Sequence, residues 1–359
     1  MQTVELNGKT ILATGAAGFV GSNLVSRLLK DLDGATIVGL DSVNDYYDPA
    51  LKEARLAKLE EEARTSRSRW IFKRGSIADK SVVDALFAEY QFSVVVNLAA
   101  QAGVRYGIEN PAAYIESNVV GFFNILEACR HSYDGGAVGV EHLVYASSSS
   151  VYGGAKKTPF SVEDRVDEPV SLYAATKKSN ELMAHAYAKL FDIPTTGLRF
   201  FTVYGPAGRP DMLYFSAAEK FARGETVKIF NYGNCKRDFT FVDDVVESLT
   251  RVMRGAPPRR KGDDGLPIPP ARVYNIGGGR PENLLDFMTT LQEELVRAGV
   301  LPEDYDFDAH RELVPMQPGD VPVTYADSEP LERDYGFTPQ IGIREGLRRF
   351  AEWFKTYRK

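Results

Sequence analysis

The sequence predicts an α/β protein built on a parallel sheet with helices on both faces. In its first 200 residues, short apolar segments alternate with amphipathic ones, as strands and helices do in such proteins. The apolar segments contain few polar residues, which is typical of strands buried on both faces. A turn with regularly spaced glycines separates the first strand from the first helix. These observations predict a doubly wound parallel sheet with a smaller, intercalated C-terminal region.

Each predicted element follows from its residue pattern. Apolar runs predict strands at residues 10–14, 35–41, 70–75, 93–99, 142–147 and 195–200. Amphipathic stretches predict helices at residues 19–30, 80–90, 119–131 and 173–191. The pattern loosens after residue 204. We therefore expect residues 1–200 to form one domain and residues 201–359 mainly a second, with later segments returning to the first.

Two segments depart from this alternation. Residues 45–69 are a long, charged, mostly helical insertion between the second and third strands. Residues 255–270 contain five prolines and three glycines, which predicts a surface loop. We expect the basic run at 259–261 to be the solvated tip of that loop.

Composition and charge narrow the classes of function. The 359 residues carry a net charge of −6 with a pI near 5.5, whereas a surface that binds nucleic acid is normally basic. Cys129 and Cys235 match no metal-binding or redox spacing, so we expect two buried thiols and no metal site. We see neither a signal peptide nor an apolar run near the ~18 residues that span a membrane. A cytoplasmic protein without nucleic-acid or membrane partners is expected.

The glycine turn has the spacing of a dinucleotide-binding site. Gly15 permits a tight turn, Gly18 lets the backbone approach a pyrophosphate, and Gly21 lets the helix pack on the strand. Asp41 ends the second strand, 20 residues after Gly21. A carboxylate there binds the ribose hydroxyls and repels a 2′-phosphate. The sequence therefore predicts a Rossmann-type fold that binds NAD rather than NADP.

A tyrosine and a lysine predict the chemistry. Tyr173 and Lys177 are four residues apart on a predicted helix, so they share one face. A tyrosine with a pKa near ~10 is a poor base at neutral pH, but a neighbouring ammonium and the positive nicotinamide favour the phenolate. Tyr173 is then expected to take a proton from an alcohol while the alcohol carbon gives hydride to NAD. A serine cluster at 147–150 precedes this pair.

The whole combination resembles the extended short-chain dehydrogenase/reductase family over essentially the entire chain. In that family a serine or threonine three residues before Val-Tyr-Gly completes the catalytic group, which implies Ser148 here, before residues 151–153. Dehydratases of the family place acids at the positions of Ser149 and Ser150, and UDP-glucuronate decarboxylases place a glutamate at the second. This chain has serine at both positions, which favours epimerisation.

Longer motifs sharpen this resemblance. The chain is similar to UDP-glucuronate 4-epimerases at NDYYD (44–48), QAGVRY (101–106), SLYAATKK (171–178), YGP (204–206), GRPDM (208–212) and KRDF (236–239). The resemblance implies interconversion of UDP-glucuronate and UDP-galacturonate, with NAD retained because there is no net redox change.

The resemblance also implies anchors for the substrate. Arg237 matches the arginine that binds the diphosphate, although a surface salt bridge to Asp243 or Asp244 is the alternative. Asp320 matches an acid that binds the uridine ribose. Gln317 stands where many sugar epimerases carry an arginine, so the second cation for the diphosphate is not evident.

The sugar side of the site departs from galactose-type epimerases. Thr202 replaces their usual asparagine, and with Arg209 nearby it fits recognition of a carboxylate at C6. Arg209 offers a two-point fork for that carboxylate, with bracing of its own loop as the alternative. Ser149 and Ser150 are expected on the carboxylate's other side.

The expected cofactor contacts complete the prediction. A common Gly-Asp pair after the third strand is Gly75-Ser76 here, which implies that Ser76, Ile77 and backbone groups hold the adenine. The predicted NAD site comprises Gly15, Ala17, Gly18, Phe19, Val20, Gly21, Asp41, Ser76, Ile77, Leu98, Ala99, Ala100, Tyr173 and Lys177.

Three other functions stay open at this point. Two enzymes share the scaffold: a 4-epimerase for UDP-glucose or UDP-N-acetylglucosamine, and a UDP-glucuronate decarboxylase. A third reading is a non-catalytic NAD-binding sensor, but such proteins typically lose the tyrosine or lysine that this chain keeps. The helices at 119–131 and 173–191 resemble the pair that forms the dimer interface in this family, which implies a homodimer.

Overall fold

The computed structural model describes residues 1–316 and 321–358, without the side chain of Pro267. Within these residues a central sheet of seven strands runs in the order β14-β7-β6-β5-β2-β3-β4, with every neighbouring pair parallel. The strands are β2 (Thr10–Thr14), β3 (Thr36–Asp41), β4 (Arg69–Arg74), β5 (Val94–Asn97), β6 (His142–Ser148), β7 (Thr195–Phe200) and β14 (Ala271–Ile276). The strand order reverses at β2, where doubly wound sheets open a crevice for ligands.

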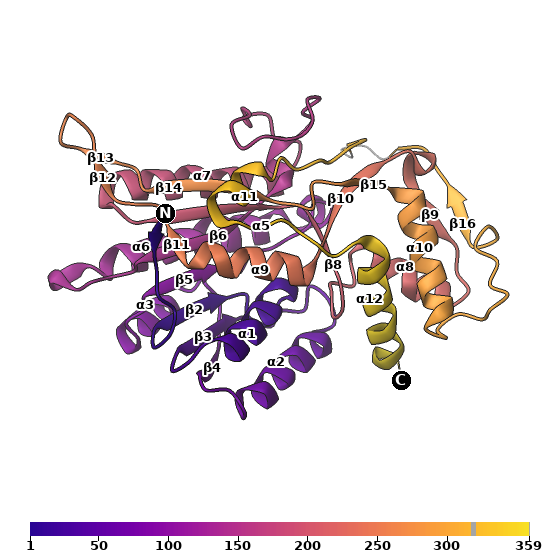
Figure 1. The fold of residues 1–359 in the computed structure, drawn as a ribbon, viewed down its shortest axis with the longest axis horizontal. Coiled ribbons are helices and arrows are strands. Elements are labelled where there is room, and N and C mark those ends of the chain that lie inside the picture. Colours follow the sequence, from indigo (N-terminus) through magenta and orange to yellow (C-terminus); the bar gives the residue numbers. More distant parts are fainter. Residues whose placement is uncertain (317–320, 359) are drawn as a thin grey trace.

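Helices cover both faces of this sheet because successive strand residues point to opposite sides. Ile11 and Ala13 of β2 join one apolar cluster, and Leu12 between them joins the other. The first cluster includes α1 (Phe19–Asp31), α2 (Pro49–Ala63) and α9 (Val242–Met253). The second includes α3 (Lys80–Glu89), α6 (Gly121–His131) and α7 (Leu172–Phe191). Figure 1 shows α1 and α9 side by side and α7 near the top of the view, beside β14.

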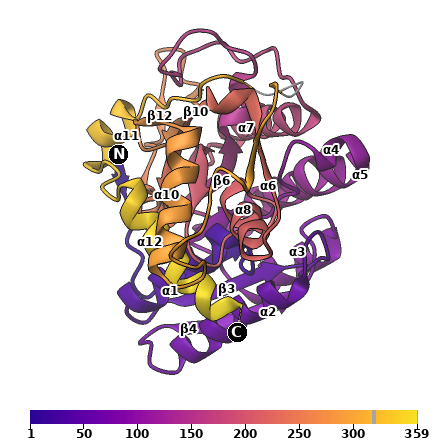
Figure 2. The same ribbon diagram turned by 90° about the vertical axis from the view of Figure 1, so that its right-hand side faces the viewer.

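The C-terminal half adds a second body of structure, which lies to the right of the sheet in Figure 1 and faces the viewer in Figure 2. β8 (Thr202–Tyr204), β10 (Lys236–Phe241) and β15 (Pro281–Asn283) form a three-stranded sheet, and β9 (Val227–Ile229) pairs with β16 (Arg311–Leu313). Helices α8 (Leu213–Ala222), α10 (Leu284–Arg297) and α12 (Ile343–Tyr357) pack around them. Aromatic side chains fill this core, and Phe239 stacks on Phe287 with ring centroids 3.8 Å apart.

Shorter elements connect these parts. They are β1 (Gln2–Thr3), α4 (Tyr106–Glu109), α5 (Pro111–Tyr114), β11 (Gly255–Ala256), β12 (Arg260–Lys261), β13 (Pro267–Ile268) and α11 (Glu329–Tyr335). A π-helical segment over Ile115–Val120 leads into α6. Short 3-10 turns lie at Asp134–Gly136, Ser149–Tyr152 and Phe230–Gly233.

The predicted Rossmann-type α/β fold is confirmed, with the predicted strands within two residues of their places. One detail differs from expectation. Residues 255–270 carry the short antiparallel pair β12–β13. The basic run at 259–261 is exposed, as predicted, and Arg259 also donates to the Asp192 carbonyl (2.8 Å) and the Tyr133 hydroxyl (2.7 Å). β14 comes from beyond residue 200 and still completes the central sheet. The domain boundary near residue 200 stays a prediction.

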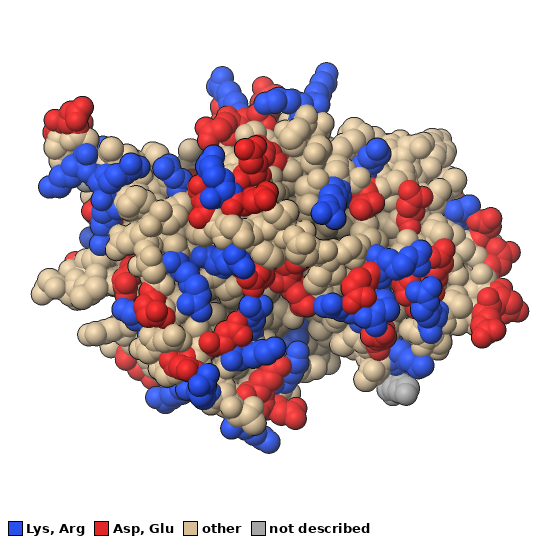
Figure 3. All heavy atoms as spheres, viewed as in Figure 1, with Lys and Arg blue, Asp and Glu red and all other residues tan. Residues whose placement is uncertain are grey.

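The surface carries mixed charge. Figure 3 shows Lys and Arg side chains interspersed with Asp and Glu across one face of the molecule. Among residues 1–316 and 321–358, no helix is long and apolar enough to cross a bilayer. Cys129 and Cys235 are buried free thiols, as predicted.

Candidate active site

A cavity of about 400 Å³ opens at the carboxyl ends of the central strands. Loops that follow six of the strands contribute to it, because the carboxyl ends of parallel strands meet at one edge of a sheet. The predicted site residues on its wall are Gly15, Gly18, Phe19, Val20, Gly21, Asp41, Ser76, Ile77, Leu98, Ala99, Ala100, Ser148, Ser149, Ser150, Tyr173, Lys177, Thr202 and Arg209. The structure therefore brings both predicted halves of the site, for cofactor and for sugar, into one cavity.

The glycine turn, residues 15–18 and hereafter the cofactor loop, lies between β2 and α1. Gly15 has φ +69°, and a Cβ there would lie 2.8 Å from the Ala99 nitrogen. A Cβ on Gly21 would lie 2.0 Å from the Gly15 carbonyl oxygen, so the helix packs too closely for any side chain. Gly18 caps α1 without a side chain that could bond the first N–H groups. Those amides are therefore free to bind a phosphate at the helix N-terminus.

Asp41 closes one end of this part of the cavity. One carboxylate oxygen accepts from the Ala17 amide (3.0 Å) and the other from the Val43 amide (2.8 Å). Ala17 is thus used to hold Asp41 and is not on the cavity wall among the residues that the structure describes. The carboxylate itself lines the cavity, where a pair of ribose hydroxyls could meet it.

Lys52 is a cavity residue that the sequence analysis did not single out. It lies on α2, donates to the Asn44 carbonyl (2.7 Å) and stands over the Tyr47 ring. Burial lowers the pKa of Lys52, and the nearby carboxylate of Asp41 opposes that shift. The signal was its place on the buried face of a predicted helix, where a lysine needs a partner.

The predicted catalytic side chains all line this cavity. Ser148 is the last residue of β6, and Tyr173 and Lys177 share one face of α7. The Ser148 hydroxyl donates to the Ser150 hydroxyl (3.1 Å), and the Lys177 ammonium donates to the Ala146 carbonyl (2.9 Å). The serine cluster and the helix pair therefore converge as the sequence pattern predicted.

The electrostatics of this group differ from the expectation in one respect. Burial raises the pKa of Tyr173, while a hydrogen bond with Ser148 and the positive charge of Arg209 pull it down. Burial also lowers the pKa of Lys177 to about 7, and its nitrogen lies 6.0 Å from the centre of the Tyr173 ring. Among the protein's own groups, Arg209 rather than Lys177 is thus the cation that favours the phenolate, because a desolvated lysine is only partly charged at neutral pH.

Arg209 stands at the sugar side of the cavity and is already paired. Its Nε donates to a carboxylate oxygen of Asp211 (2.9 Å), and the Tyr46 hydroxyl donates to the other oxygen (3.2 Å). Burial opposes the charge of Arg209, but the hydrogen bond and charge of Asp211 raise its pKa. Thr202, Ser149 and the Arg209 side chain line the same cavity. Asp211 and Tyr46 fall within the quoted motifs, yet no role was predicted for either.

A buried ion pair holds Ser147, which lies in β6 next to Ser148. Arg199 of β7 binds both carboxylate oxygens of Glu181, with Nε–Oε1 at 2.8 Å and Nη2–Oε2 at 2.9 Å. Glu181 in turn accepts from the Ser147 hydroxyl at 2.7 Å. All three residues are buried. No local motif marks this group, since its members lie on three separate elements.

Of the two predicted anchors for the nucleotide, Arg237 and Asp320, the structure describes only Arg237. Arg237 is the second residue of β10 and is not among the cavity residues in the described part of the chain. It donates to the carbonyls of Lys236 (3.0 Å) and Pro322 (3.3 Å). The alternative salt-bridge partners are engaged elsewhere: Asp243 pairs with Arg349 (3.1 Å), and Asp244 accepts from backbone amides. Asp320 and Gln317 lie outside the described residues.

The fold and this cavity together define an NAD-dependent enzyme. Gly15 and Gly21 leave no room for a side chain, the first amides of α1 have no side-chain cap, and the Asp41 carboxylate lines the cavity. The sequence matches the NAD dependent epimerase/dehydratase family over residues 11–277. The chain belongs to that family.

Relatives with known names or structures agree with this assignment. Protein CapI of Staphylococcus aureus is 45% identical over 97% of this chain and 99% of that protein. UDP-glucuronate 4-epimerase 4 of Arabidopsis thaliana is 42% identical over 99% of this chain and 78% of that protein. The crystal structure of the UDP-glucuronic acid 4-epimerase from Bacillus cereus, with UDP-glucuronic acid and NAD, superposes with a TM-score of 0.79. It is 30% identical and covers 97% of this chain and 99% of that one. The protein is an NAD-dependent nucleotide-sugar 4-epimerase.

Proposed function

We propose that this enzyme interconverts UDP-glucuronate and UDP-galacturonate, as a cytoplasmic homodimer. The observation that carries the proposal is that Arg209, Thr202, Ser149 and Ser150 all line the same cavity. Guanidinium and hydroxyl donors are the groups that bind a carboxylate. The named relatives that act on UDP-glucuronate support the same substrate.

The proposed chemistry begins at Tyr173. Its phenolate takes the proton of the C4 hydroxyl, and Ser148 donates a hydrogen bond to the same oxygen. NAD bound beside Tyr173 would supply the hydride chemistry, as acceptor of the C4 hydride and then as its donor. Tyr173 then gives its proton back to the oxygen after the 4-keto sugar has turned its other face. The alcohol is thereby inverted without net oxidation.

In the proposed roles, the cofactor contacts follow the cavity wall. The cofactor loop and the N-terminus of α1 hold the pyrophosphate, Asp41 holds the adenosine ribose, and Ser76 and Ile77 lie by the adenine. Lys177 holds the nicotinamide ribose together with Tyr173. Arg237 and Asp320 remain the proposed anchors for the diphosphate and the uridine.

Arg209 has a second proposed task, which is to protect the intermediate. The 4-keto intermediate carries a ketone beta to its carboxylate and loses CO₂ when the carboxylate bond aligns with the carbonyl π system. A guanidinium held by Asp211 fixes the carboxylate at a defined angle. Neither Ser149 nor Ser150 supplies an acid for elimination.

The test is to incubate the purified protein with UDP-glucuronate without added NAD and to follow sugars by chromatography and CO₂ by gas detection. UDP-galacturonate without CO₂ is expected. A pentose product with CO₂ would make the enzyme a decarboxylase, and turnover of UDP-glucose or UDP-N-acetylglucosamine alone would make it a neutral-sugar epimerase. No turnover of any of these sugars, even with NAD added, would leave a non-catalytic NAD-binding protein.

The proposed homodimer rests on an exposed apolar surface. Phe123 of α6 and Leu182 and Leu190 of α7 are 43%, 60% and 70% exposed, and Ile115 and Val120 lie exposed on the π-helical segment before α6. Helices α6 and α7 contact each other, so these side chains belong to neighbouring elements. An apolar surface of this kind is typical of a subunit interface. Sedimentation of the protein and of Leu182→Asp should show a dimer and a monomer.

A further inference from the structure

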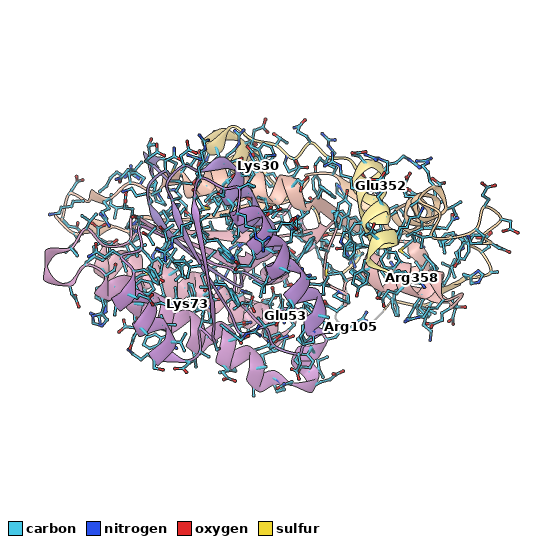
Figure 4. All side chains as sticks on the ribbon, turned by 90° about the horizontal axis from the view of Figure 1, so that it is seen from below. Lys30, Glu53, Lys73, Arg105, Glu352 and Arg358 are labelled. Carbon is cyan, nitrogen blue, oxygen red and sulfur yellow. The ribbon has the colours of Figure 1, made fainter. Side chains whose placement is uncertain are left out.

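The insertion at residues 45–69 stands out because its helix α2 contacts both halves of the site. Seen from below, Glu53 of α2 lies between Lys73 of β4 and Arg358, which follows α12 (Figure 4). Helix α2 packs on α1 and β4 through Leu51, Leu56 and Leu59. A supporting role for the sheet would need only these leucines. The polar residues of the same segment require a separate explanation.

Arg55 of α2 makes the most unusual contacts in this segment. It is 4% exposed, and its N–H groups donate five hydrogen bonds, all to neutral oxygens. One bond reaches the Ala17 carbonyl of the cofactor loop (2.9 Å) and one the Tyr47 hydroxyl (2.7 Å). Two more reach the Ala207 carbonyl (3.0 and 2.7 Å), and the last reaches the Gly208 carbonyl (2.8 Å).

The carbonyls on the far side belong to residues 205–209, hereafter the arginine loop, which ends in Arg209. Ala207 has φ +51°, a left-handed conformation that a residue with a Cβ rarely adopts. Both bonds to its carbonyl come from Arg55, so this cation holds the strained turn two residues before Arg209. A second contact from the same segment, from the Tyr46 hydroxyl to Asp211, holds the partner of Arg209.

We propose that Arg55 is a positioning residue that fastens the cofactor loop to the arginine loop, so that binding of NAD and binding of the acidic sugar strengthen each other. The planar guanidinium spans the two loops because its donors point in fixed, diverging directions. When NAD orders the cofactor loop, the arginine loop is held in the conformation that presents Arg209. Coupling of this kind is reciprocal, so a sugar bound at Arg209 must in turn slow the loss of NAD.

This inference rests on the proposed function for the identity of the sugar, and the experiment separates the two. The exchange of bound NAD for isotope-labelled NAD is timed in the holoenzyme, with and without saturating UDP-glucuronate. Turnover is measured on the same samples. If wild-type enzyme fails to convert UDP-glucuronate, the proposed function is wrong, and the exchange is timed with whichever UDP-sugar is turned over.

The variants are Arg55→Gln, Arg55→Lys and, as a control, Arg64→Gln at the exposed end of the same helix. In wild type and Arg64→Gln, the sugar is expected to slow NAD exchange on the order of tenfold. In Arg55→Gln this slowing should disappear and KM for the sugar should rise more than kcat falls. Arg55→Lys should behave like Arg55→Gln, because an ammonium keeps the charge but cannot span both loops.

Two results would overturn the inference. One is unchanged slowing and unchanged KM in Arg55→Gln, and the other is full recovery in Arg55→Lys, which would make charge alone sufficient. Should Arg55→Gln fail to fold, Tyr47→Phe removes one acceptor and leaves the three loop carbonyls in place. That variant should fold and lose part of the slowing, and wild-type slowing in it would count against the inference.

Discussion

Arg209, which lines the cavity, forms a two-point ion pair with Asp211, its Nε donating to one carboxylate oxygen at 2.9 Å and its Nη2 to the other. The pairing occupies one edge of the guanidinium and fixes the plane of the remaining N–H groups. An arginine held in this way meets an incoming carboxylate in one orientation only. The ion pair thus fixes the orientation of the Arg209 guanidinium as well as holding its charge at the site.

Replacing Arg209 by alanine should weaken the binding of UDP-glucuronate and make the 4-keto intermediate more prone to lose CO₂. We expect a higher KM for UDP-glucuronate, by about 10- to 100-fold for a lost charged hydrogen bond, and more CO₂ and 4-keto-pentose per turnover. Coupled chromatography and CO₂ detection measure both. Arg223→Ala, an exposed arginine that follows α8, is the control. Unchanged CO₂ release and unchanged uronate KM in Arg209→Ala would show that the carboxylate is held elsewhere.

Tyr173→Phe should abolish most of the activity while sparing the cofactor. Loss of the general base is expected to lower kcat by about 10³-fold, within the range usual for such groups. NAD content after gel filtration should stay near that of wild type, since the cofactor loop, Asp41 and Lys177 still hold the cofactor. Tyr187→Phe on the same helix, whose hydroxyl bonds Glu127 at 2.7 Å, is a matched control. Comparable activity in the two variants would assign the proton transfer to another residue.

Glu181→Gln should destabilise the fold and weaken the hydrogen bond that holds Ser147. Removing one partner of a buried ion pair typically costs about 3–5 kcal/mol, because the other charge stays buried and unpaired. Urea denaturation measures the loss, and the exposed pair Lys80–Asp84 offers a contrast in Asp84→Asn, which should change stability little. Equal losses of stability in Glu181→Gln and Asp84→Asn would mean that the buried pair of Glu181 and Arg199 stabilises the fold no more than an exposed pair does.

Asp238 should make stability depend on pH. Burial raises its pKa to about 6, although the amides of Ala326, Gly278 and Gly279 oppose that shift and Glu282 adds to it. A carboxyl whose folded pKa lies above its unfolded value stabilises fully below the unfolded pKa and loses this contribution as pH rises through about 6.

Between the ordinary pKa of 3.8 and about pH 6, the free energy of unfolding should fall by about 3 kcal/mol. One unit of pKa corresponds to about 1.36 kcal/mol. Urea denaturation of wild type and Asp238→Asn at several pH values between 4 and 8 checks it. The difference in the free energy of unfolding between the two proteins should shrink as pH rises. A difference that stays constant with pH would mean that Asp238 does not titrate in this range.

Most of the fold and the residues at the centre of the site could be predicted from local sequence patterns. The period of the apolar residues predicted the strands and helices, and the glycine spacing and Asp41 predicted the cofactor wall. These features act within one element or one turn, so they are visible in a short stretch of sequence. Even the four-residue spacing of Tyr173 and Lys177 is a property of a single helix.

The tertiary structure decided what these residues touch. No local pattern joins Arg55 to Ala207, Tyr46 to Asp211 or Arg199 to Glu181, since each contact links separate elements of the fold. Nor could the sequence show that burial lowers the pKa of Lys177 to about 7 and leaves Arg209 as the nearby cation for Tyr173. The sequence by itself determined which elements form and which chemical groups they carry, because that information is local. Packing of those elements decided the pairings and the pKa values, because both depend on neighbours distant along the chain and on the exclusion of water.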